Sequence, residues 1–411
     1  MTVKEKSMEG RKILSGIKVI DLASFVAGPA SAGLLGDFGA DVIKVEPPEG
    51  GDFFRRVYRT PGMPPCDHNF AWMFTGRNKR SLALNIKQPE AHAALMRLVK
   101  EADVVVVNYP PQVRERLKIR YEDLAPLNER LIYASISGYG DKGAEINNPG
   151  FDLTAWWART GMMDTVRGKG APPAMCMPAM GDHPTALGLF GGIMLALFDR
   201  ERTGKGTEVT TSLLANGLWV NGILAQAILC GSGEVSVPGP ANPLTALNNL
   251  YLCKDERWFV LAIQNEEKCW PVMTSLLKRP DLTEDPRFID TKSRWKNAAV
   301  LSGIFADIFK TEDMRHWIKL FAGTPILISP VNKLEDIRDD RQMRDAEVIV
   351  PYTTPDGSQM ETIVSPMWVR GAEKRAPGHA PELGQHTDEI LREAGYSDAE
   401  VQTMRKTGAV A

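Results

Sequence analysis

Four consecutive valines at residues 104–107 constrain the fold of this chain more than any other segment. β-Branched side chains favour strands over helices. A strand with no polar alternation is typical of a parallel sheet whose two faces are both covered by helices. Because parallel strands need crossover connections that are usually helical, we expect an α/β protein.

Strand and helix patterns alternate on both sides of this segment. We expect strands at 17–23, 41–46, 81–85, 103–108, 131–136 and 208–212, and helices at 28–38, 89–101 and 185–199. Such alternation is typical of βαβ units. The first half of the chain is therefore expected to form a doubly wound parallel sheet.

The length of the chain indicates more than one domain. A chain of 411 residues is too long for one ordinary core and suggests two or three domains. The pattern changes near residue 225, after which we expect a strand at 258–263 and helices within 265–320. We therefore expect a large domain at 1–224 and a smaller domain at 225–330.

Composition excludes several classes of function. The formal net charge of -2 gives no electrostatic basis for binding nucleic acid or an anionic membrane. The longest apolar run, near residues 187–198, is too short to span a bilayer. Scattered cysteines without a CxxC pair argue against disulfides and zinc, and residues 1–11 lack the apolar core of a signal peptide. We expect a cytoplasmic protein without a metal site.

One aspartate, Asp182, stands just before the apolar helix pattern at 185–199. Desolvating a carboxylate is unfavourable unless something pairs with it. Asp182 is either a helix N-cap, with Pro184 in the first turn, or a carboxylate nucleophile held at the positive end of the helix dipole. Local sequence alone favours the cap.

Two further residues near Asp182 are candidates for supporting roles. Asp152 lies upstream and is a candidate acid–base partner. His183 is either an acid–base group or a polar residue of the cap region, and the sequence favours the second because it shows no partner.

Two weaker patterns point to nucleotide ligands. The turn at 28–33 follows a strand, and Glu46 ends the next strand, but the spacing is not the GxGxxG of an NAD site. Basic residues also gather near expected strand ends, where they are either solvated surface groups or phosphate contacts. These residues are Arg77, Lys79, Arg80, Lys87, Arg114, Arg116 and Lys118.

Motifs along essentially the whole chain resemble the class III CoA-transferase family, the group of carnitine-CoA transferase and formyl-CoA transferase. These motifs occupy residues 16–22, 27–29, 39–46, 78–81, 138–140, 181–182, 202–206 and 383–389. The resemblance implies a Rossmann-like large domain built from both chain ends, so that 331–411 is a linker and a return to that domain. It also implies an interlocked homodimer and acyl-CoA as a substrate, with no permanently bound cofactor.

The resemblance implies roles for individual residues. It places the nucleophile at Asp182, which would pass CoA from an acyl-CoA to a carboxylic acid through an aspartyl anhydride and an aspartyl-CoA thioester. It places CoA contacts at Phe25, Val26, Ala27, Leu84, Lys87, Asn108 and Arg116. Departures at Val26 and Pro47 disfavour formyl or oxalyl substrates. The segments at 149–155 and 181–183 look more like the branch that handles phenyllactate and 2-hydroxyisocaproate, which favours 2-hydroxy, aryl or branched acids.

The same fold also carries α-methylacyl-CoA racemases, which gives the alternative function. Those enzymes move an α-proton with a histidine at the position of Phe151 in this chain. Because phenylalanine cannot carry a proton, the sequence favours CoA transfer over racemisation. Phe151, Asp152 and His183 are candidate support residues around Asp182.

Overall fold

The computed structural model describes residues 10–235 and 243–411, so most of the expected polar N-terminal segment lies outside the described residues. The chain forms two compact units. The larger comprises Met1–Asp164, Met175–Ser232 and Arg344–Ala411, and the smaller comprises Thr165–Ala174 and Gly233–Met343. The division into domains at 1–224, 225–330 and 331–411 stays a prediction.

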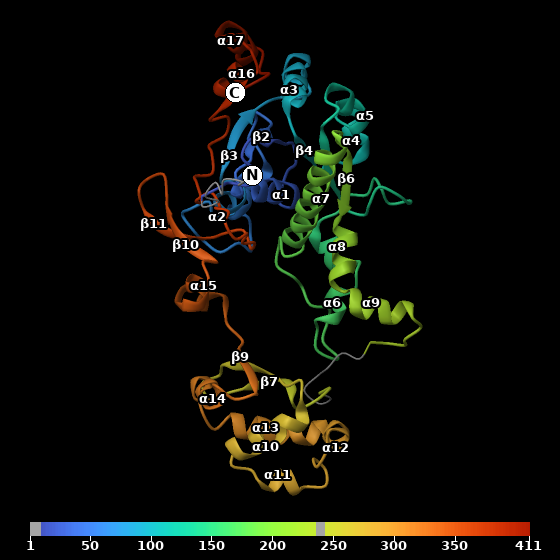
Figure 1. Ribbon diagram of the computed structural model, residues 1–411, viewed down its shortest axis with the longest axis vertical. Coiled ribbons are helices and arrows are strands. Elements are labelled where there is room, and N and C mark those ends of the chain that lie inside the picture. The colour runs from blue at the N-terminus through green and yellow to red at the C-terminus, as the bar shows by residue number, and fades with distance from the viewer. Residues whose placement is uncertain (1–9, 236–242) are drawn as a thin grey trace, which may run out of the picture. The chain divides into compact units, whose positions relative to one another are not determined.

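A six-stranded parallel sheet forms the centre of the larger unit (Figure 1). Its strands are β1 (Lys18–Asp21), β2 (Asp41–Glu46), β3 (Lys79–Ala83), β4 (Val104–Val107), β5 (Ile132–Ser137) and β6 (Glu208–Ser212). Their order across the sheet is β3-β2-β1-β4-β5-β6, and every neighbouring pair is parallel. The predicted α/β fold is confirmed.

Helices cover the sheet, and further short elements surround it. The helices are α1 (Ala27–Asp37), α2 (Phe70–Gly76), α3 (Pro89–Glu101), α4 (Pro111–Leu117), α5 (Tyr121–Leu124), α6 (Met162–Thr165), α7 (Asp182–Thr203), α8 (Leu213–Val220), α9 (Gly222–Leu229), α16 (Thr387–Glu393) and α17 (Asp398–Lys406). Short helical turns are η1 (Phe53–Arg59), η2 (Ala125–Leu127) and the π-helical η3 (Asp152–Ala158), and β10 (Ile349–Thr353) and β11 (Gln359–Ile363) form an antiparallel hairpin.

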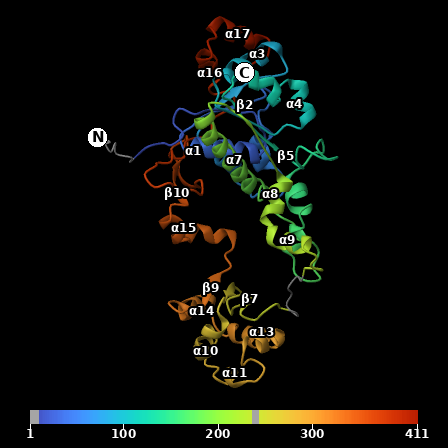
Figure 2. The ribbon, with the colours of Figure 1, turned by 45° about the vertical axis from the view of Figure 1, so that its right-hand side comes forward.

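The valines of β4 face two different hydrophobic cores. Val104 and Val106 pack with side chains of α1 and α7, which lie side by side in Figures 1 and 2. Val105 and Val107 pack into the opposite core with side chains of α3, α16 and α17. All four valines are 0% exposed, which explains why this strand has no polar alternation. The helices α16 and α17 come from the C-terminal segment. The larger unit is therefore built from residues near both ends of the chain.

The smaller unit has its own core. An antiparallel sheet of β7 (Asn248–Leu252), β8 (Trp258–Ala262) and β9 (Leu327–Pro330) packs against helices through a cluster of aromatic residues. The helical elements are α10 (Glu266–Leu276), α11 (Asp281–Glu284), α12 (Thr291–Lys296), α13 (Ala298–Phe309), α14 (Met314–Phe321) and η4 (Leu334–Asp339). Along the chain, the division between the two units falls within α15 (Arg341–Asp345). In the described part of the chain, no helix is both long and apolar enough to cross a membrane.

A buried network of charges ties the first three strands together. The Lys44 ammonium on β2 lies 3.1 Å from Asp52 and 3.8 Å from Asp21, and it also donates to the Ala23 carbonyl. Lys79 on β3 lies 2.9 Å from the other oxygen of Asp21. Burial lowers the pKa of Lys44, but the carboxylates of Asp21, Asp52 and Glu46 raise it more. Lys44 is therefore charged, and its position depends on all of these partners.

Lys44→Met is expected to destabilise the protein by about 3–5 kcal/mol, because it leaves buried carboxylates without their cation. Urea unfolding followed by circular dichroism measures this change. The matched control is Lys18→Met, since Lys18 forms an exposed pair with Glu101 at 2.8 Å and such pairs contribute less than about 1 kcal/mol. Equal effects of the two substitutions would contradict a structural role for the buried network.

Candidate functional site

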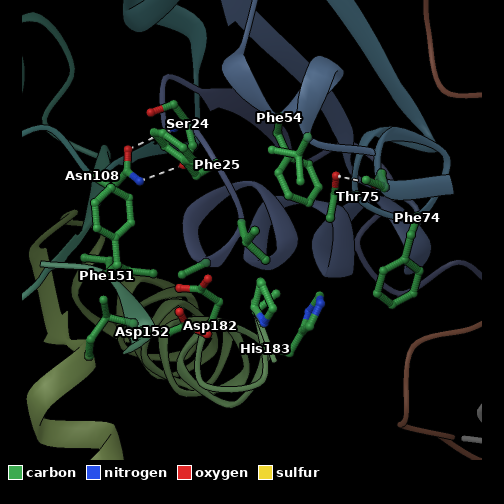
Figure 3. A pocket seen from close by; sticks show the side chains of 18 of the residues that line it. Ser24, Phe25, Phe54, Phe74, Thr75, Asn108, Phe151, Asp152, Asp182 and His183 are labelled. Atoms are coloured by element: carbon green, nitrogen blue, oxygen red, sulfur yellow. Dashed lines mark hydrogen bonds between the residues drawn. The ribbon is translucent and has the colours of Figure 1, made fainter. Parts of the chain in front are cut away.

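A cavity of about 750 Å³ opens at the carboxyl ends of β1, β4 and β5 (Figure 3). The chain leaves β1 for β2 on one side of the sheet and reaches β4 on the other, so β1 and β4 flank a topological switch point. Ligands of open α/β sheets bind at such points. The described lining includes the three polar residues that the sequence singled out, Asp182, Asp152 and His183. It also includes Phe151 and four of the expected CoA contacts, which are Phe25, Val26, Ala27 and Asn108.

The turn after β1 is held in an unusual conformation. Phe25 has φ +64°, a left-handed value that costs of order 1–3 kcal/mol for a bulky residue. Its backbone N–H donates to Asp52 at 3.1 Å, and Asp52 is a partner of Lys44. Ser24 and Asn108 exchange two hydrogen bonds, of 2.9 and 2.8 Å, between the turn and the end of β4 (Figure 3). These contacts fix the turn at the edge of the cavity.

Asp182 is the first residue of α7, and Gly181 is the N-cap. The Asp182 side chain makes no capping hydrogen bond, so the cap interpretation of Asp182 is wrong. Asp152 supplies the oxygen instead, because its carboxylate accepts from the Gly181 N–H at 3.3 Å. A side chain at position 181 would lie 2.7 Å from the Trp156 ring, so the close approach of η3 requires glycine there. The helix terminus therefore leaves the Asp182 carboxylate free to face the cavity.

The electrostatic surroundings of Asp182 differ from those expected. Burial, and secondly the charge of Asp152, raise the pKa of Asp182 to about 7. A carboxylate at the positive end of a helix dipole is expected to have a lowered pKa. No side-chain hydrogen bond from the described residues stabilises the Asp182 carboxylate, so desolvation outweighs the helix dipole. The ionised Asp182 carboxylate is therefore poorly stabilised by the protein.

His183 lies beside Asp182 on α7 and is half-buried. Its ring packs edge-on against Phe74 of α2, with 5.2 Å between the ring centroids. Burial lowers the pKa of His183, while Asp152 opposes that shift. The imidazole is therefore neutral at the pH at which Asp182 is ionised.

Aromatic side chains form much of the cavity wall. Phe151 is 57% exposed and packs edge-on against Phe25, with 5.7 Å between ring centroids. Phe54, Phe70 and Phe74 line other parts of the wall. None of the described residues that line the cavity is a lysine or an arginine. The cavity therefore suits an uncharged, apolar group next to the Asp182 carboxylate.

A second cavity of about 940 Å³ lies between α3 and α4 and is basic. Lys87 and Arg116, two of the expected CoA contacts, line it and are exposed. Further side chains that line it include Arg97, Lys100 and Lys118. Leu84, another expected contact, is 2% exposed within the hydrophobic core and lines neither cavity, and its role stays a prediction.

Several basic residues near the strand ends serve the fold. Arg77 is paired with Asp37 at 2.8 Å, Lys79 with Asp21, and Arg80 with Asp41. Arg114 is buried and donates to the Tyr109 carbonyl at 2.6 Å. These ion pairs disfavour phosphate binding by Arg77, Lys79 and Arg80. Phosphate contact stays a prediction for Arg114 and for the residues that line the basic cavity.

Glu46 is also engaged within the protein. Arg55 donates two hydrogen bonds of 2.7 Å to its carboxylate, and Ser81 donates another. A ribose has no free oxygen of Glu46 to bind, which disfavours the dinucleotide interpretation. Within residues 10–235 and 243–411, no group of three His, Cys, Asp or Glu side chains is placed to hold a metal.

Sequence reasoning missed parts of the cavity wall. Residues 360–363 of the β10–β11 hairpin line it, although they come from the segment expected to be a linker and a return to the large domain. Arg77 donates to the Ile363 carbonyl at 2.6 Å and anchors this hairpin. The alternating exposure of residues 359–363 fits a strand, but no motif in this segment indicates a functional site.

Comparison with known proteins agrees with this architecture. Residues 14–387 match the family described as CoA-transferase family III. An (R)-2-hydroxy-4-methylpentanoate CoA-transferase from Clostridioides difficile is 32% identical, over 97% of this chain and 99% of that protein. A cinnamoyl-CoA:phenyllactate CoA-transferase from Clostridium sporogenes is 29% identical, over 96% of each chain. The crystal structure of a CAIB/BAIF family protein from Brucella suis has a TM-score of 0.82 and 28% identity, and covers 93% of this chain and 99% of that one.

The chain belongs to CoA-transferase family III. It is therefore a class III CoA-transferase, and the family implies acyl-CoA as a substrate. The resemblance seen in the sequence is confirmed across nearly the whole chain.

Asp182→Asn is expected to stabilise the protein above pH 7, with a gain that shrinks towards pH 4. The pKa of Asp182 is raised to about 7 in the folded protein, whereas an unfolded aspartate titrates near 3.9. The wild type therefore loses stability as the pH rises from about 4 to about 7, and the amide avoids this loss. Since one pKa unit corresponds to about 1.4 kcal/mol, we expect a gain above about 1 kcal/mol at pH 8.

Urea unfolding at about pH 5 and about pH 8 measures this difference. The exposed Asp141 provides the control, and Asp141→Asn should give no comparable gain. An Asp182→Asn gain that is the same at both pH values would show that Asp182 is not destabilised by its burial.

Proposed function

We propose that Asp182 is the nucleophile of a CoA transfer between an acyl-CoA and a free carboxylic acid. The observation that carries this proposal is the placement of Asp182 at the N-terminus of α7, beside a cavity with a largely apolar wall and without a partner among the described side chains. A carboxylate with a raised pKa is poorly stabilised in its ground state and gains from forming a neutral ester-like bond. Asp152 caps α7 and holds Asp182 in place.

The reaction proceeds by exchange of acyl groups on this carboxylate. An Asp182 oxygen attacks the thioester carbonyl carbon, the C–S bond breaks, and CoA leaves as the thiolate. The thiolate then attacks the aspartyl carbonyl of the mixed anhydride, which releases the first acid and forms an aspartyl-CoA thioester. The acceptor carboxylate repeats these steps in reverse and regenerates Asp182. The apolar wall excludes water, which would hydrolyse the anhydride.

We propose that CoA spans the two cavities of the larger unit. Phe25, Val26, Ala27 and Asn108 border the cavity that holds Asp182, and they suit the thioester end of the substrate. Lys87 and Arg116 line the basic cavity, where they suit the phosphates. In the chain, residues 25–27, Lys87 and Asn108 follow the carboxyl ends of β1, β3 and β4, and Arg116 lies on α4, the helix that follows β4.

The acids are proposed to be aryl or branched monocarboxylic acids, including 2-hydroxy acids. The aromatic wall and the absence of lysine and arginine from the described lining support this class. A second carboxylate would be buried there without a cation. Relatives that act on 2-hydroxy-4-methylpentanoate and phenyllactate are consistent with it. Racemisation is disfavoured, because Phe151 offers no group to move a proton.

The enzyme is also proposed to act as an interlocked homodimer. Apolar side chains on α8 and α9 are exposed in the single chain, including Trp219 at 85%, Ile223 at 89% and Leu229 at 77%. Exposed apolar patches of this kind mark interfaces between proteins.

Asp182→Ala and Asp182→Asn are expected to lower CoA transfer by at least about 10³-fold, since no other group replaces the nucleophile. Wild-type enzyme incubated with an acyl-CoA should gain the mass of CoA on a peptide that contains Asp182, and both variants should lack it. Asp141→Ala is the matched control, because Asp141 is exposed and lines neither of the two cavities. Turnover of either variant at the wild-type rate would overturn this mechanism.

A panel of acceptor acids tests the proposed substrate class. We expect kcat/KM for 3-phenylpropanoate, phenyllactate and 4-methylpentanoate to exceed that for succinate and glutarate by about 10²-fold or more, because an unpaired buried carboxylate costs several kcal/mol. Mass spectrometry of the new thioesters measures each rate. Equal kcat/KM values for succinate and the monocarboxylic acids would show that a cationic side chain pairs with the second carboxylate, and would contradict the proposed substrate class.

A further inference from the structure

The side chain that follows the nucleophile has no role in the transfer as described above. His183 lines the same cavity as Asp182, and both residues belong to the first turn of α7 (Figure 3). The ring contacts Phe74, but neither ring nitrogen has a hydrogen-bond partner among the described residues. A half-buried imidazole beside a nucleophile thus keeps an unused donor.

The chemistry at Asp182 needs such a donor. Attack on a thioester carbonyl moves negative charge onto the carbonyl oxygen, and enzymes stabilise this charge with donors held in place beforehand. The described cavity lining offers no lysine or arginine for that purpose.

Three other polar side chains of the lining already form hydrogen bonds within the protein. The Thr75 hydroxyl donates to the Ala71 carbonyl at 3.1 Å, and the Ser137 hydroxyl accepts from the Gly140 N–H at 3.0 Å. The Asn108 amide is paired with the backbone of Ser24.

The charge state of His183 suits this task. Burial lowers its pKa, whereas the pKa of Asp182 is raised to about 7. Above pH 7 the pair therefore consists of a carboxylate and a neutral imidazole, which has one N–H donor. A protonated ring would instead form an ion pair with Asp182 and weaken the nucleophile.

We infer that His183 is a catalytic residue whose neutral ring donates its N–H to the carbonyl oxygen under attack by Asp182. This inference rests on the proposed function of Asp182. As the Asp182 oxygen bonds to the carbonyl carbon, the π electrons move to the carbonyl oxygen, which accepts the hydrogen bond. Collapse re-forms the C=O bond and expels the CoA thiolate, and His183 keeps its proton throughout. The hydrogen bond is therefore needed for every acyl group, whether or not it carries a 2-hydroxyl.

His183→Phe and His183→Gln in the full-length enzyme test this role. Phenylalanine keeps a ring but removes the donor, and we expect kcat to fall by about 10²-fold, the loss typical of one oxyanion donor. Glutamine keeps an N–H, and we expect it to restore at least part of that loss. The matched control is His316→Phe, because His316 is exposed in the smaller unit and packs on Trp317. Rates are measured with 3-phenylpropanoate and with its 2-hydroxy analogue, phenyllactate.

A comparable loss for both acids in His183→Phe, with recovery in His183→Gln, supports the inference. A wild-type rate in His183→Phe would overturn it, and so would a loss confined to phenyllactate, which would assign His183 to the 2-hydroxyl. The CoA adduct on Asp182 separates this inference from the function on which it rests. If the wild type forms no adduct, the nucleophile proposal fails; if it forms the adduct and His183→Phe forms it equally fast, only the role of His183 fails.

Discussion

The buried ammonium of Lys44 holds together the part of the structure on which the site depends. It contacts Asp21 of β1, Asp52 before η1 and the Ala23 carbonyl, so it joins two strands to the turn that borders the cavity. Asp52 in turn accepts from the Phe25 N–H, which keeps Phe25 in its left-handed conformation. Buried ion pairs add little net stability, but loss of one member is strongly unfavourable. The network therefore fixes one arrangement of this turn.

The cavity wall near α7 also depends on a buried carboxylate. Asp152, rather than Asp182, caps the first turn of α7, and Gly181 lets Trp156 approach that turn closely. Asp152 thereby accepts from a backbone N–H of the helix terminus, and after burial its charge is the second cause of the raised pKa of Asp182. This arrangement lowers the stability of the folded protein at a functional site, which is common where activity requires a destabilised group. It also leaves an apolar, aromatic space in which a reactive anhydride is shielded from water.

Much of the fold could be predicted from local sequence patterns. The valines of β4 required two covered faces, and each face has its own core of helices. Asp182 was identified through its place before an apolar helix and through motifs that span the chain. The basic residues were harder, because a sequence does not show which carboxylate lies opposite an arginine. Arg77 and Arg80 were candidates for either solvated surface groups or phosphate contacts, yet each pairs with an aspartate, Asp37 or Asp41, that is far away in the sequence.

The sequence by itself determined the alternation of strands and helices, the family, and some of the residues around the cavity, among them Asp182, Asp152 and His183. These features depend on local periodicity and on short motifs, which are complete within a few neighbouring residues. Only the tertiary structure decided that Asp152 caps α7, that the pKa of Asp182 rises to about 7, and that residues 360–363 close one wall. Each of these depends on burial and on contacts between distant segments, because desolvation and charge act through space rather than along the chain.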